Sequence, residues 1–556
     1  MDKGRQQQQQ PRGRSAGAME KARGDDKAGG NDDEAALERL GHKQELKRNF
    51  STVSMLGLAF AIVNTWPALA AALNVALPSG GTSSVIWGLV TAGLCNLCLA
   101  ASLAEFLSAF PTAGGQYHWA AIVAWERSSR AVSYVTGWIN VAGWVAVSAS
   151  GGLLGTTFVV NVVSLLRPGY EAQPWHQFLI YVALTLLALS INAFFTRLLP
   201  YFTKAAFYWS IGGFVVISIT VLACASPDYQ SGGFVYGHFI NEVGWPDGQA
   251  WLLGLLQGAW ALTGFDATAH MIEEIPEPHV QGPRIMLYCI FIGVFTGFVF
   301  LSALLFCVKD IERVINAPYG PLLQIFMDAT KSPAGSTCLL MIPTIGIVFT
   351  LTTLMCASSR MSYAFARDRG MPFSSVFARV HPGLDVPLNA LLWTAAWVIV
   401  FGCIFLGSTS TFNAITAASV VALGITYAIP PAINVLRGRK MLPENRSFKL
   451  PEALGWTVNL VGILWTILTT VLFVFPPKVP VTASNMNYCI VAFGIILLIA
   501  VLTWILDGRK HYKGPKLDVQ GLVEGKVEGI EGDAAQPAAL PSNKASSDVP
   551  MAEGNQ

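Results

Sequence analysis

The sequence predicts an all-α polytopic membrane protein. Hydrophobic residues make up 53% of the 556-residue chain and charged residues only 13%, and the mean hydropathy is +0.48. Too little polar surface remains to cover soluble globules of this size. Uncharged stretches long enough to cross a bilayer as helices recur along the chain. The composition therefore excludes a string of soluble domains.

Runs of about 20 apolar residues predict twelve transmembrane helices. The third run is unusually long, because it has no charged residue between Val132 and Leu166, and it has to tilt or project beyond the bilayer. The predicted spans lie near residues 52–77, 84–109, 131–166, 176–195, 203–226, 249–275, 285–308, 332–359, 386–407, 411–436, 453–475 and 486–507.

Lysine and arginine residues orient these spans. With the N-terminus placed inside, the five inner loops hold fourteen of them and the six outer loops hold five. Because cytoplasmic loops carry the positive excess, both termini are expected in the cytoplasm. The polar tails, residues 1–45 and 511–556, are expected to be disordered, which leaves residues 46–510 as the membrane domain.

No motif for catalysis or for a cofactor occurs in the sequence. We find no phosphate-binding loop, nucleophile–base pair or metal-ligand cluster, so an enzyme and an ATP-driven pump are not expected. Cys95 and Cys98 form a C-x-x-C pair inside an uncharged span and are interpreted as ordinary buried thiols. We expect no metal, no cofactor and no nucleic-acid partner.

The sixth predicted span places ionisable groups at membrane depth. An uncharged run beginning near Ala250 reaches Gly264 and then presents Asp266 and His270. A bilayer tolerates a broken helix and charged groups only where they face protein or a water-filled cavity. The segment is therefore predicted to line a substrate pathway.

The first predicted span is interrupted in a corresponding place. Pro67 removes an amide donor and disfavours helix at Trp66, beside the polar Asn64 and Thr65. Interruptions at matching positions of two five-helix halves indicate an inverted repeat with a site near the bilayer midplane. Unwound backbone and half-helix N-termini attract a substrate's anionic group. The alternative is that Pro67 only kinks its helix and that Gly264 only allows close packing.

Four segments, residues 104–119, 260–274, 358–373 and 386–390, resemble the amino acid–polyamine–organocation transporters, above all the fungal branch that carries amino acids, 4-aminobutyrate and choline. The first two are similar to the patterns E-x₅-P-T-x-G-G-x-Y-x-W and T-G-[YF]-D-A-x-A-H-x-x-E-E. The resemblance extends over residues 45–510. It implies a leucine-transporter-like fold of five plus five inverted helices and two peripheral helices, and secondary active transport, most often driven by protons.

The resemblance also implies a substrate site between the two interruptions. The first unwound helix of relatives receives the substrate carboxylate, and the sixth receives the amine end and supplies an aromatic gate. An aromatic cage for a quaternary ammonium is a further hypothesis for Trp66, Trp260 and Phe265, against ordinary packing. The predicted substrate-binding residues are Asn64, Thr65, Trp66, Trp260, Thr263, Gly264, Phe265 and Asp266.

Charged groups around the sixth span are candidates for coupling and gating. Asp266 has three possible roles: it could pair with the substrate, carry a proton or cap a helix N-terminus. His270 lies one turn later and could either exchange a proton with Asp266 or serve as a packing residue. The two glutamates that follow, Glu273 and Glu274, are interpreted either as a gate with Arg284 or Arg360 or as ordinary interfacial charges. The coupling and gating candidates are Asp266, His270, Glu273, Glu274 and Lys204.

Two further charged residues have an ordinary structural interpretation beside or in place of a functional one. Lys204 lies where proton-coupled relatives can carry a lysine in place of a sodium ion, although a snorkelling lysine fits equally well. Glu105, at the end of the second span, is expected to anchor a loop by ion pairing.

The sequence therefore predicts an integral, multi-pass membrane protein that imports a small amine-bearing metabolite with protons, such as an amino acid, 4-aminobutyrate or choline. Its partners are this substrate, protons and the lipid bilayer. The plasma membrane is the expected location, with the vacuolar membrane as the alternative. The alternative functions are transport of an alkaloid or other specialised metabolite linked to a fungal biosynthetic pathway, and nutrient sensing by a receptor with little flux.

Overall fold

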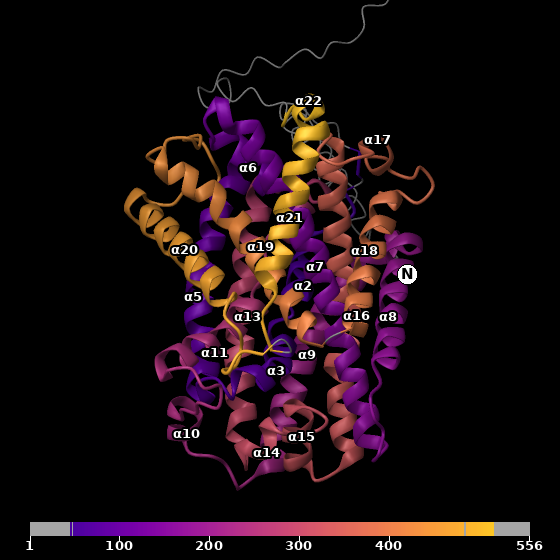
Figure 1. Ribbon diagram of the computed structural model, residues 1–556, viewed down its shortest axis with the longest axis vertical. Helices are drawn as coiled ribbons and strands as arrows, with labels where there is room; N and C mark the ends of the chain where they lie inside the picture. Colours follow the sequence, from indigo (N-terminus) through magenta and orange to yellow (C-terminus); the bar gives the residue numbers. More distant parts are fainter. Residues whose placement is uncertain (1–44, 47, 408, 483–484, 516–556) are drawn as a thin grey trace, which may run out of the picture.

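The computed structural model describes residues 45–46, 48–407, 409–482 and 485–515, and within these ranges helices form the whole framework (Figure 1). Ten helical segments of this part are long and apolar enough to cross a membrane. The predicted class, an all-helical polytopic membrane protein, is confirmed. Nearly all of the two predicted disordered tails lies outside the described residues.

Helices occupy each of the predicted spans. The ten long segments count α2 and α3 together. Two of the predicted spans are not among them: the α11–α12 pair, because it is interrupted, and α18, because its apolar stretch is short. In chain order the helices are α2 (Thr52–Val63), α3 (Thr65–Ala71), α5 (Gly81–Ala109), α7 (Glu126–Leu166), α8 (Pro174–Phe194), α9 (Leu199–Ala225), α11 (Asp247–Ala261), α12 (Ala267–His270), α13 (Pro278–Phe306), α16 (Pro333–Arg367), α18 (Leu388–Gly407), α19 (Thr409–Leu436), α20 (Glu452–Leu472) and α21 (Cys489–Thr503).

Short helices gather at the two ends of the bundle. Figure 1 shows one end, named the upper end, with α6 (Gln116–Val123), α17 (Ser374–Phe377) and α22 (Arg509–His511). The opposite, lower end carries α10 (Gly232–Gly237), α14 (Ile311–Ile315) and α15 (Pro321–Thr330). The first group belongs to the loops and tail predicted to be inside, and the second to those predicted to be outside.

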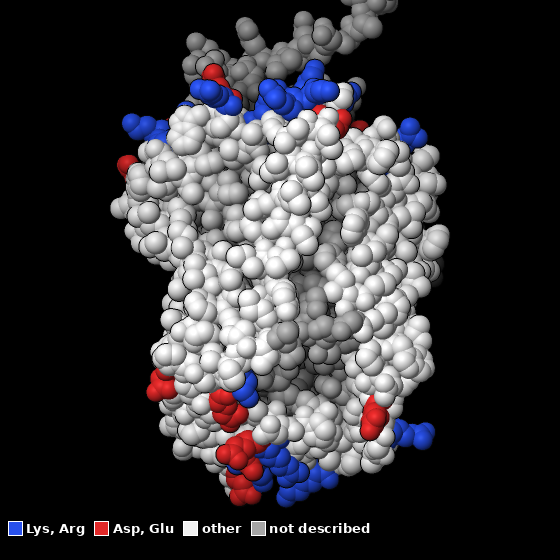
Figure 2. Space-filling model, in the orientation of Figure 1, with Lys and Arg blue, Asp and Glu red and all other residues white. Residues whose placement is uncertain are grey.

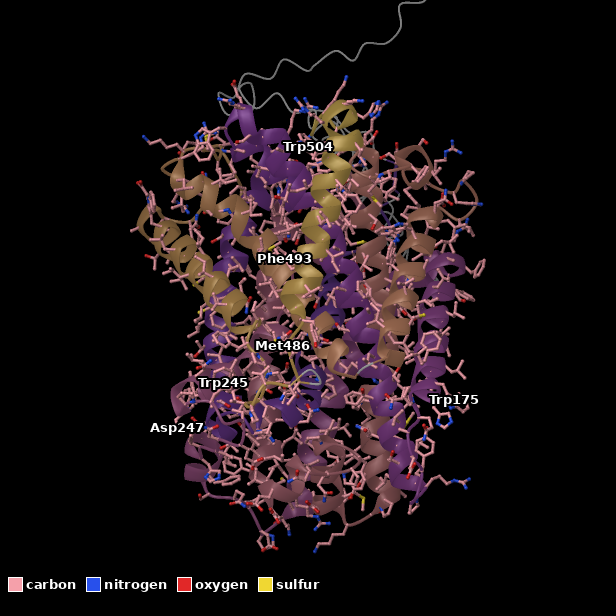
Figure 3. The ribbon with its side chains drawn as sticks, viewed as in Figure 1. Trp175, Trp245, Asp247, Met486, Phe493 and Trp504 are labelled. Carbon is pink, nitrogen blue, oxygen red and sulfur yellow. The ribbon has the colours of Figure 1, made fainter. Side chains whose placement is uncertain are left out.

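The surface is divided in the same way. Figure 2 shows lysine and arginine gathered at the upper end, both signs of charge at the lower end, and an uncharged band between them. Tryptophans lie near the edges of this band: Trp504 toward the upper end, and Trp175 and Trp245 toward the lower end (Figure 3). Amphipathic tryptophan rings favour the headgroup region, so the band has the arrangement of a bilayer-spanning surface.

The longest helix, α7, contains 41 residues, as the uncharged third run predicts. At about 1.5 Å per residue it extends roughly 60 Å, twice the thickness of the hydrocarbon core. Its central residues, among them Asn140 and Trp144, are fully buried. Because α7 packs against both α16 and α19, it brings these polar groups to the middle of the bundle.

The first span breaks within the predicted stretch, residues 64–67, but only at its first residue. Helix α2 ends at Val63, Asn64 adopts a left-handed conformation with φ 41°, and α3 begins at Thr65. Trp66, expected to be non-helical, lies inside α3. Pro67 is accommodated because it falls in the first turn of a helix, where its missing N–H has no intrahelical partner to lose.

The sixth span breaks where the sequence predicts. Helix α11 ends at Ala261, Gly264 has φ +96°, and α12 begins at Ala267. A Cβ added to Gly264 would lie 2.9 Å from Cγ2 of Ile62, near the end of α2. The two interruptions are therefore in contact with each other inside the protein.

Candidate functional site

Asp266 lies at the centre of a buried polar cluster beside the break at Gly264. Its carboxylate is fully buried, and oxygen Oδ2 accepts hydrogen bonds from Gln116 Nε2 at 2.8 Å and from Trp144 Nε1 at 3.3 Å. Oxygen Oδ1 accepts from the hydroxyl of Tyr427 at 2.5 Å. These donors come from α6, α7 and α19, so three separate helices meet at one carboxylate. Hydrogen-bond donors therefore face both oxygens of the carboxylate.

Neighbouring contacts fix the direction of each hydrogen bond. The indole N–H of Trp144 is a donor only. The Tyr427 oxygen accepts the N–H of Gly264 at 3.2 Å, which leaves the phenolic proton for the carboxylate. Gln116 Oε1 accepts from Asn140 Nδ2 at 2.9 Å, which turns the amide NH₂ of Gln116 toward the carboxylate. The cluster is therefore arranged to hold a negative charge.

His270 forms a hydrogen-bonded pair with this carboxylate. Its Nδ1 lies 2.9 Å from the carbonyl oxygen of Ala113, and its Nε2 lies 3.1 Å from Oδ2 of Asp266. A carbonyl oxygen only accepts, so Nδ1 carries a proton in every state. A further proton then lies either on Nε2, as imidazolium and carboxylate, or on Asp266 beside a neutral imidazole. The geometry therefore offers a bridging proton two positions, Nε2 of His270 and Oδ2 of Asp266.

Asp266 does not act as a helix cap through its side chain. It occupies the N-cap position of α12, but its side chain makes no capping hydrogen bond. The N-cap alternative is therefore wrong, because donors from neighbouring helices take both carboxylate oxygens instead.

The aromatic candidates have separate partners. The Trp66 indole donates to Ser210 Oγ at 2.9 Å, and its ring lies 4.8 Å from that of Phe300. Phe265 packs on Tyr427 with ring centroids 4.7 Å apart. In the described part of the chain no ring contact joins Trp66 and Phe265 to Trp260. The aromatic cage stays a prediction.

Polar side chains at the first interruption are available to a ligand. Asn64 Nδ2 and Thr65 Oγ1 are buried and have no hydrogen-bond partner among the described residues. The hydroxyl of Thr263, by contrast, bonds within its own helix to the carbonyl of Ala259 at 2.9 Å. Buried polar atoms are rarely left unpaired, so these two side chains are unusual in this part of the structure.

Two buried ion pairs, named the upper ion pairs, follow the cluster toward the upper end. Glu273 makes a two-pronged contact with Arg367, at 2.9 and 3.0 Å, and Glu274 accepts from Nε of Arg360 at 3.0 Å. The predicted contact of a glutamate with Arg360 is confirmed, whereas Arg284 is exposed on α13. The sequence gave no indication of Arg367. These pairs fasten the segment after α12 to the end of α16.

Lys204 and Glu105 lie outside this cluster. The Lys204 ammonium is 5.9 Å from the ring centroid of Tyr201, one turn earlier on α9. The buried Glu105 pairs with Arg439 at 2.8 Å and Arg446 at 2.7 Å. The expectation that Glu105 anchors a loop by ion pairing is confirmed.

Four central residues escaped the sequence reasoning: Gln116, Asn140, Trp144 and Tyr427. The available signal was polarity in an apolar setting, since Asn140 lies within the long uncharged third span and Gln116 within the motif that follows the second. Which of several such residues meet at one point depends on the packing of α6, α7 and α19, which local patterns do not encode.

These features define a class of protein, the multi-pass membrane permeases with two interrupted helices around a central polar site. The profile of the amino acid permease family matches residues 50–500, and the chain belongs to this family. It is a transporter protein and not an enzyme.

Relatives of several kinds are similar over most of their length. A Macrophomina phaseolina protein named as an amino acid/polyamine transporter is 36% identical over 438 residues, 78% of this chain and 96% of its own. The choline transporter of Saccharomyces cerevisiae is 32% identical over 473 residues, 84% of this chain and 83% of its own. The swainsonine transporter of Arthroderma benhamiae is 28% identical over 470 residues, 84% of this chain and 92% of its own.

Proposed function

We propose that the protein is a secondary active transporter that imports a small amine-bearing metabolite, namely an amino acid, 4-aminobutyrate or choline, together with protons. The observation that carries the proposal is the Asp266–His270 pair. In this proposal the pair carries the transported proton in a buried position, and its hydrogen-bond geometry supports that role. It also lies directly beside the interruption at Gly264, where substrate binds in this proposal. A proton and a substrate bound at one hinge affect the same conformational equilibrium.

The substrate site lies between the two interruptions in this proposal. Unpaired side chains at Asn64 and Thr65 and the nearby helix ends support binding of a carboxylate or hydroxyl group. Because protein donors already surround Asp266, backbone carbonyls and aromatic faces are left to receive the amine end. The substrate-binding set remains Asn64, Thr65, Trp66, Trp260, Thr263, Gly264, Phe265 and Asp266.

Alternating access supplies the transport cycle. We propose twelve spans over residues 46–510, arranged as a five-plus-five inverted repeat and two peripheral helices, with the upper end and both termini in the cytoplasm. The basic upper end supports this orientation (Figure 2). With the upper ion pairs closed, the cytoplasmic route is shut, and it opens when Glu273 and Glu274 part from their arginines. Lys204 is a secondary candidate for coupling.

Uptake in a permease-deficient yeast tests the proposal. Cells expressing the chain should accumulate radiolabelled choline, 4-aminobutyrate or an amino acid, and a protonophore should abolish accumulation. Lys204→Gln separates the coupling candidates, because it should leave the protonophore effect intact if Asp266 and His270 carry the proton. Failure to take up any member of the panel would contradict the substrate class, and would favour a receptor. Tagged protein at the cell surface rather than the vacuole would support the plasma membrane.

Transport of a specialised metabolite is the second candidate. It is favoured by the similarity to the swainsonine transporter of Arthroderma benhamiae. Labelled swainsonine is therefore included in the uptake panel. Uptake of labelled swainsonine, without uptake of choline, 4-aminobutyrate or amino acids, would replace the first candidate with the second.

A further inference from the structure

A second buried histidine–aspartate pair lies near the upper end, and the proposed transport mechanism does not use it. Nε2 of His118, on α6, is 2.5 Å from Oδ2 of Asp368, the C-cap residue of α16. The His118 side chain is completely buried, and that of Asp368 is 7% exposed. The pair therefore joins two helices that lie far apart in the sequence.

The second ring nitrogen distinguishes His118 from His270. Nδ1 of His118 lies 2.9 Å from the hydroxyl oxygen of Thr112, whereas Nδ1 of His270 faces the carbonyl of Ala113. A hydroxyl can donate to a neutral imidazole nitrogen or accept from a protonated one, whereas a carbonyl only accepts. His118 can thus gain or lose a proton at Nδ1 without losing a hydrogen bond, while Nε2–H still donates to Asp368.

Other titratable and charged groups adjoin the pair. The Tyr117 hydroxyl donates to Asp368 Oδ2 at 2.7 Å, and burial together with this carboxylate raises the pKa of Tyr117 well above its usual value. Tyr117 therefore remains a donor across the physiological pH range. Burial and the same carboxylate also raise the pKa of Tyr512. Arg367, adjacent to Asp368, is engaged with Glu273.

We propose that His118 and Asp368 form a second proton-binding site, separate from Asp266 and His270, and that a proton on His118 holds the upper end of the transporter closed. The proposal rests on the proposed function in identifying the upper end as cytoplasmic. In the protonated state the contact is an imidazolium–carboxylate pair, which is stronger than the neutral hydrogen bond that remains after deprotonation. Asp368 follows Arg367 directly, so tightening the contact also secures the arginine of an upper ion pair.

The sign of the pH effect follows from this arrangement. Acidification adds the proton to His118 and stabilises the closed upper end. Alkalinisation leaves a neutral imidazole and loosens the contact between α6 and the end of α16. In the cell, an acidic cytosol would therefore slow the step in which the transporter opens inward, which limits further proton entry.

Hydrogen–deuterium exchange tests the proposal without knowledge of the substrate. The full-length protein in lipid nanodiscs is compared between pH 5.5 and 8, with correction for the intrinsic exchange rate, in peptides that cover residues 112–124 and 360–370. Protection of both segments should be about fivefold greater at the acidic end, as expected when a neutral hydrogen bond becomes charge-assisted. Equal protection at the two pH values would overturn the proposal.

His118→Gln provides the decisive variant. Glutamine keeps a donor for Asp368 and an acceptor for Thr112 but does not titrate, so folding is preserved while the pH response should vanish. The matched control is His279→Gln, an exposed histidine at the start of α13, which should retain the wild-type response. A wild-type response in His118→Gln would refute the assignment.

Uptake measurements keep the two proposals apart. The protonophore sensitivity of uptake tests the proposed coupling residues, whereas exchange protection tests His118. If uptake proves independent of protons while His118→Gln still abolishes the pH response, the proposed coupling fails and the second site stands. If the coupling is confirmed and hydrogen–deuterium exchange is independent of pH, the proposed coupling stands and the second proton-binding site is refuted.

Discussion

The carbonyl oxygen of Ala113 lies 2.9 Å from Nδ1 of His270. The N–H of the same alanine donates to Oε1 of Glu273 at 3.2 Å. One residue of the loop between α5 and α6 therefore contacts both the proton-holding pair and an upper ion pair. A shift of this loop changes both contacts together, which gives a direct physical route between the central site and the upper end.

Asp266→Asn should reduce uptake by about tenfold or more. Asparagine removes the negative charge that balances a protonated His270, and its NH₂ group faces donors where the carboxylate accepted their hydrogen bonds. Breaking a buried, paired charge costs about 3–5 kcal/mol, enough for this loss. Radiolabelled uptake, normalised to the amount of protein in the membrane, measures the effect.

Asp247→Asn is the matched control for that charge change. Asp247 is exposed at the start of α11 and accepts a hydrogen bond from Asn241. Its replacement should leave uptake close to the wild-type rate. Full uptake by Asp266→Asn would remove this carboxylate from the mechanism.

Gly264→Ala should abolish transport or prevent accumulation of the protein. The backbone φ of +96° costs an L-residue about 1–2 kcal/mol, and the added Cβ would lie 2.9 Å from Ile62. Gly212→Ala is the control, because Gly212 lies within α9 and a Cβ there meets nothing within 4 Å. Surface expression and uptake measured side by side should separate the two, and wild-type behaviour of Gly264→Ala would show that the break needs no glycine.

Sequence reasoning located the spans and the sixth-helix break because these depend on local properties. Apolar runs set the helices, and a carboxylate beside a glycine marked the interruption at Gly264. The first break was predicted over residues 64–67 and is confined to Asn64, because proline was treated as a breaker although the first turn of a helix accepts it.

The partners of Asp266 could not be predicted in the same way. Gln116, Trp144 and Tyr427 lie 122 to 161 residues from it in the sequence, and only helix packing brings them together. Charge pairing was only partly predictable for the same reason. A buried glutamate requires a cation nearby, but the selection of Arg367 over Arg284 depends on which residue faces inward.

Tyr427→Phe should lower uptake several-fold without preventing folding. It removes the hydroxyl that donates to Asp266 and accepts from the Gly264 N–H, while the ring remains packed on Phe265. Hydrogen bonds to charged groups contribute about 1.5–3 kcal/mol. Tyr181→Phe is the control, since among the described residues its buried hydroxyl bonds to the Val398 carbonyl, between α8 and α18 and away from Asp266. Equal uptake by both variants would show that the Tyr427 hydroxyl has no special role.

Arg367→Gln should open the upper end more often. It leaves the buried Glu273 without its cation, and loss of one partner of a buried pair costs about 3–5 kcal/mol. Cys356, buried on α16 one turn before Arg360, reports the opening. Its labelling by a maleimide in membrane vesicles, followed by mass spectrometry of its peptide, should be about tenfold faster or more than in the wild type.

Exchange of the two charges then tests whether the pair itself holds the upper end closed. The double variant Glu273→Arg with Arg367→Glu restores the attraction but loses the acceptor for the Ala113 N–H, so Cys356 labelling should return only part of the way to the wild-type rate. Lys449→Gln is the control, because its pair with Glu444 is exposed, and exposed pairs contribute about 1 kcal/mol or less. If the double variant labels as fast as Arg367→Gln, the pair is not what closes this end; if both label at the wild-type rate, the closure depends on Glu274 and Arg360 instead.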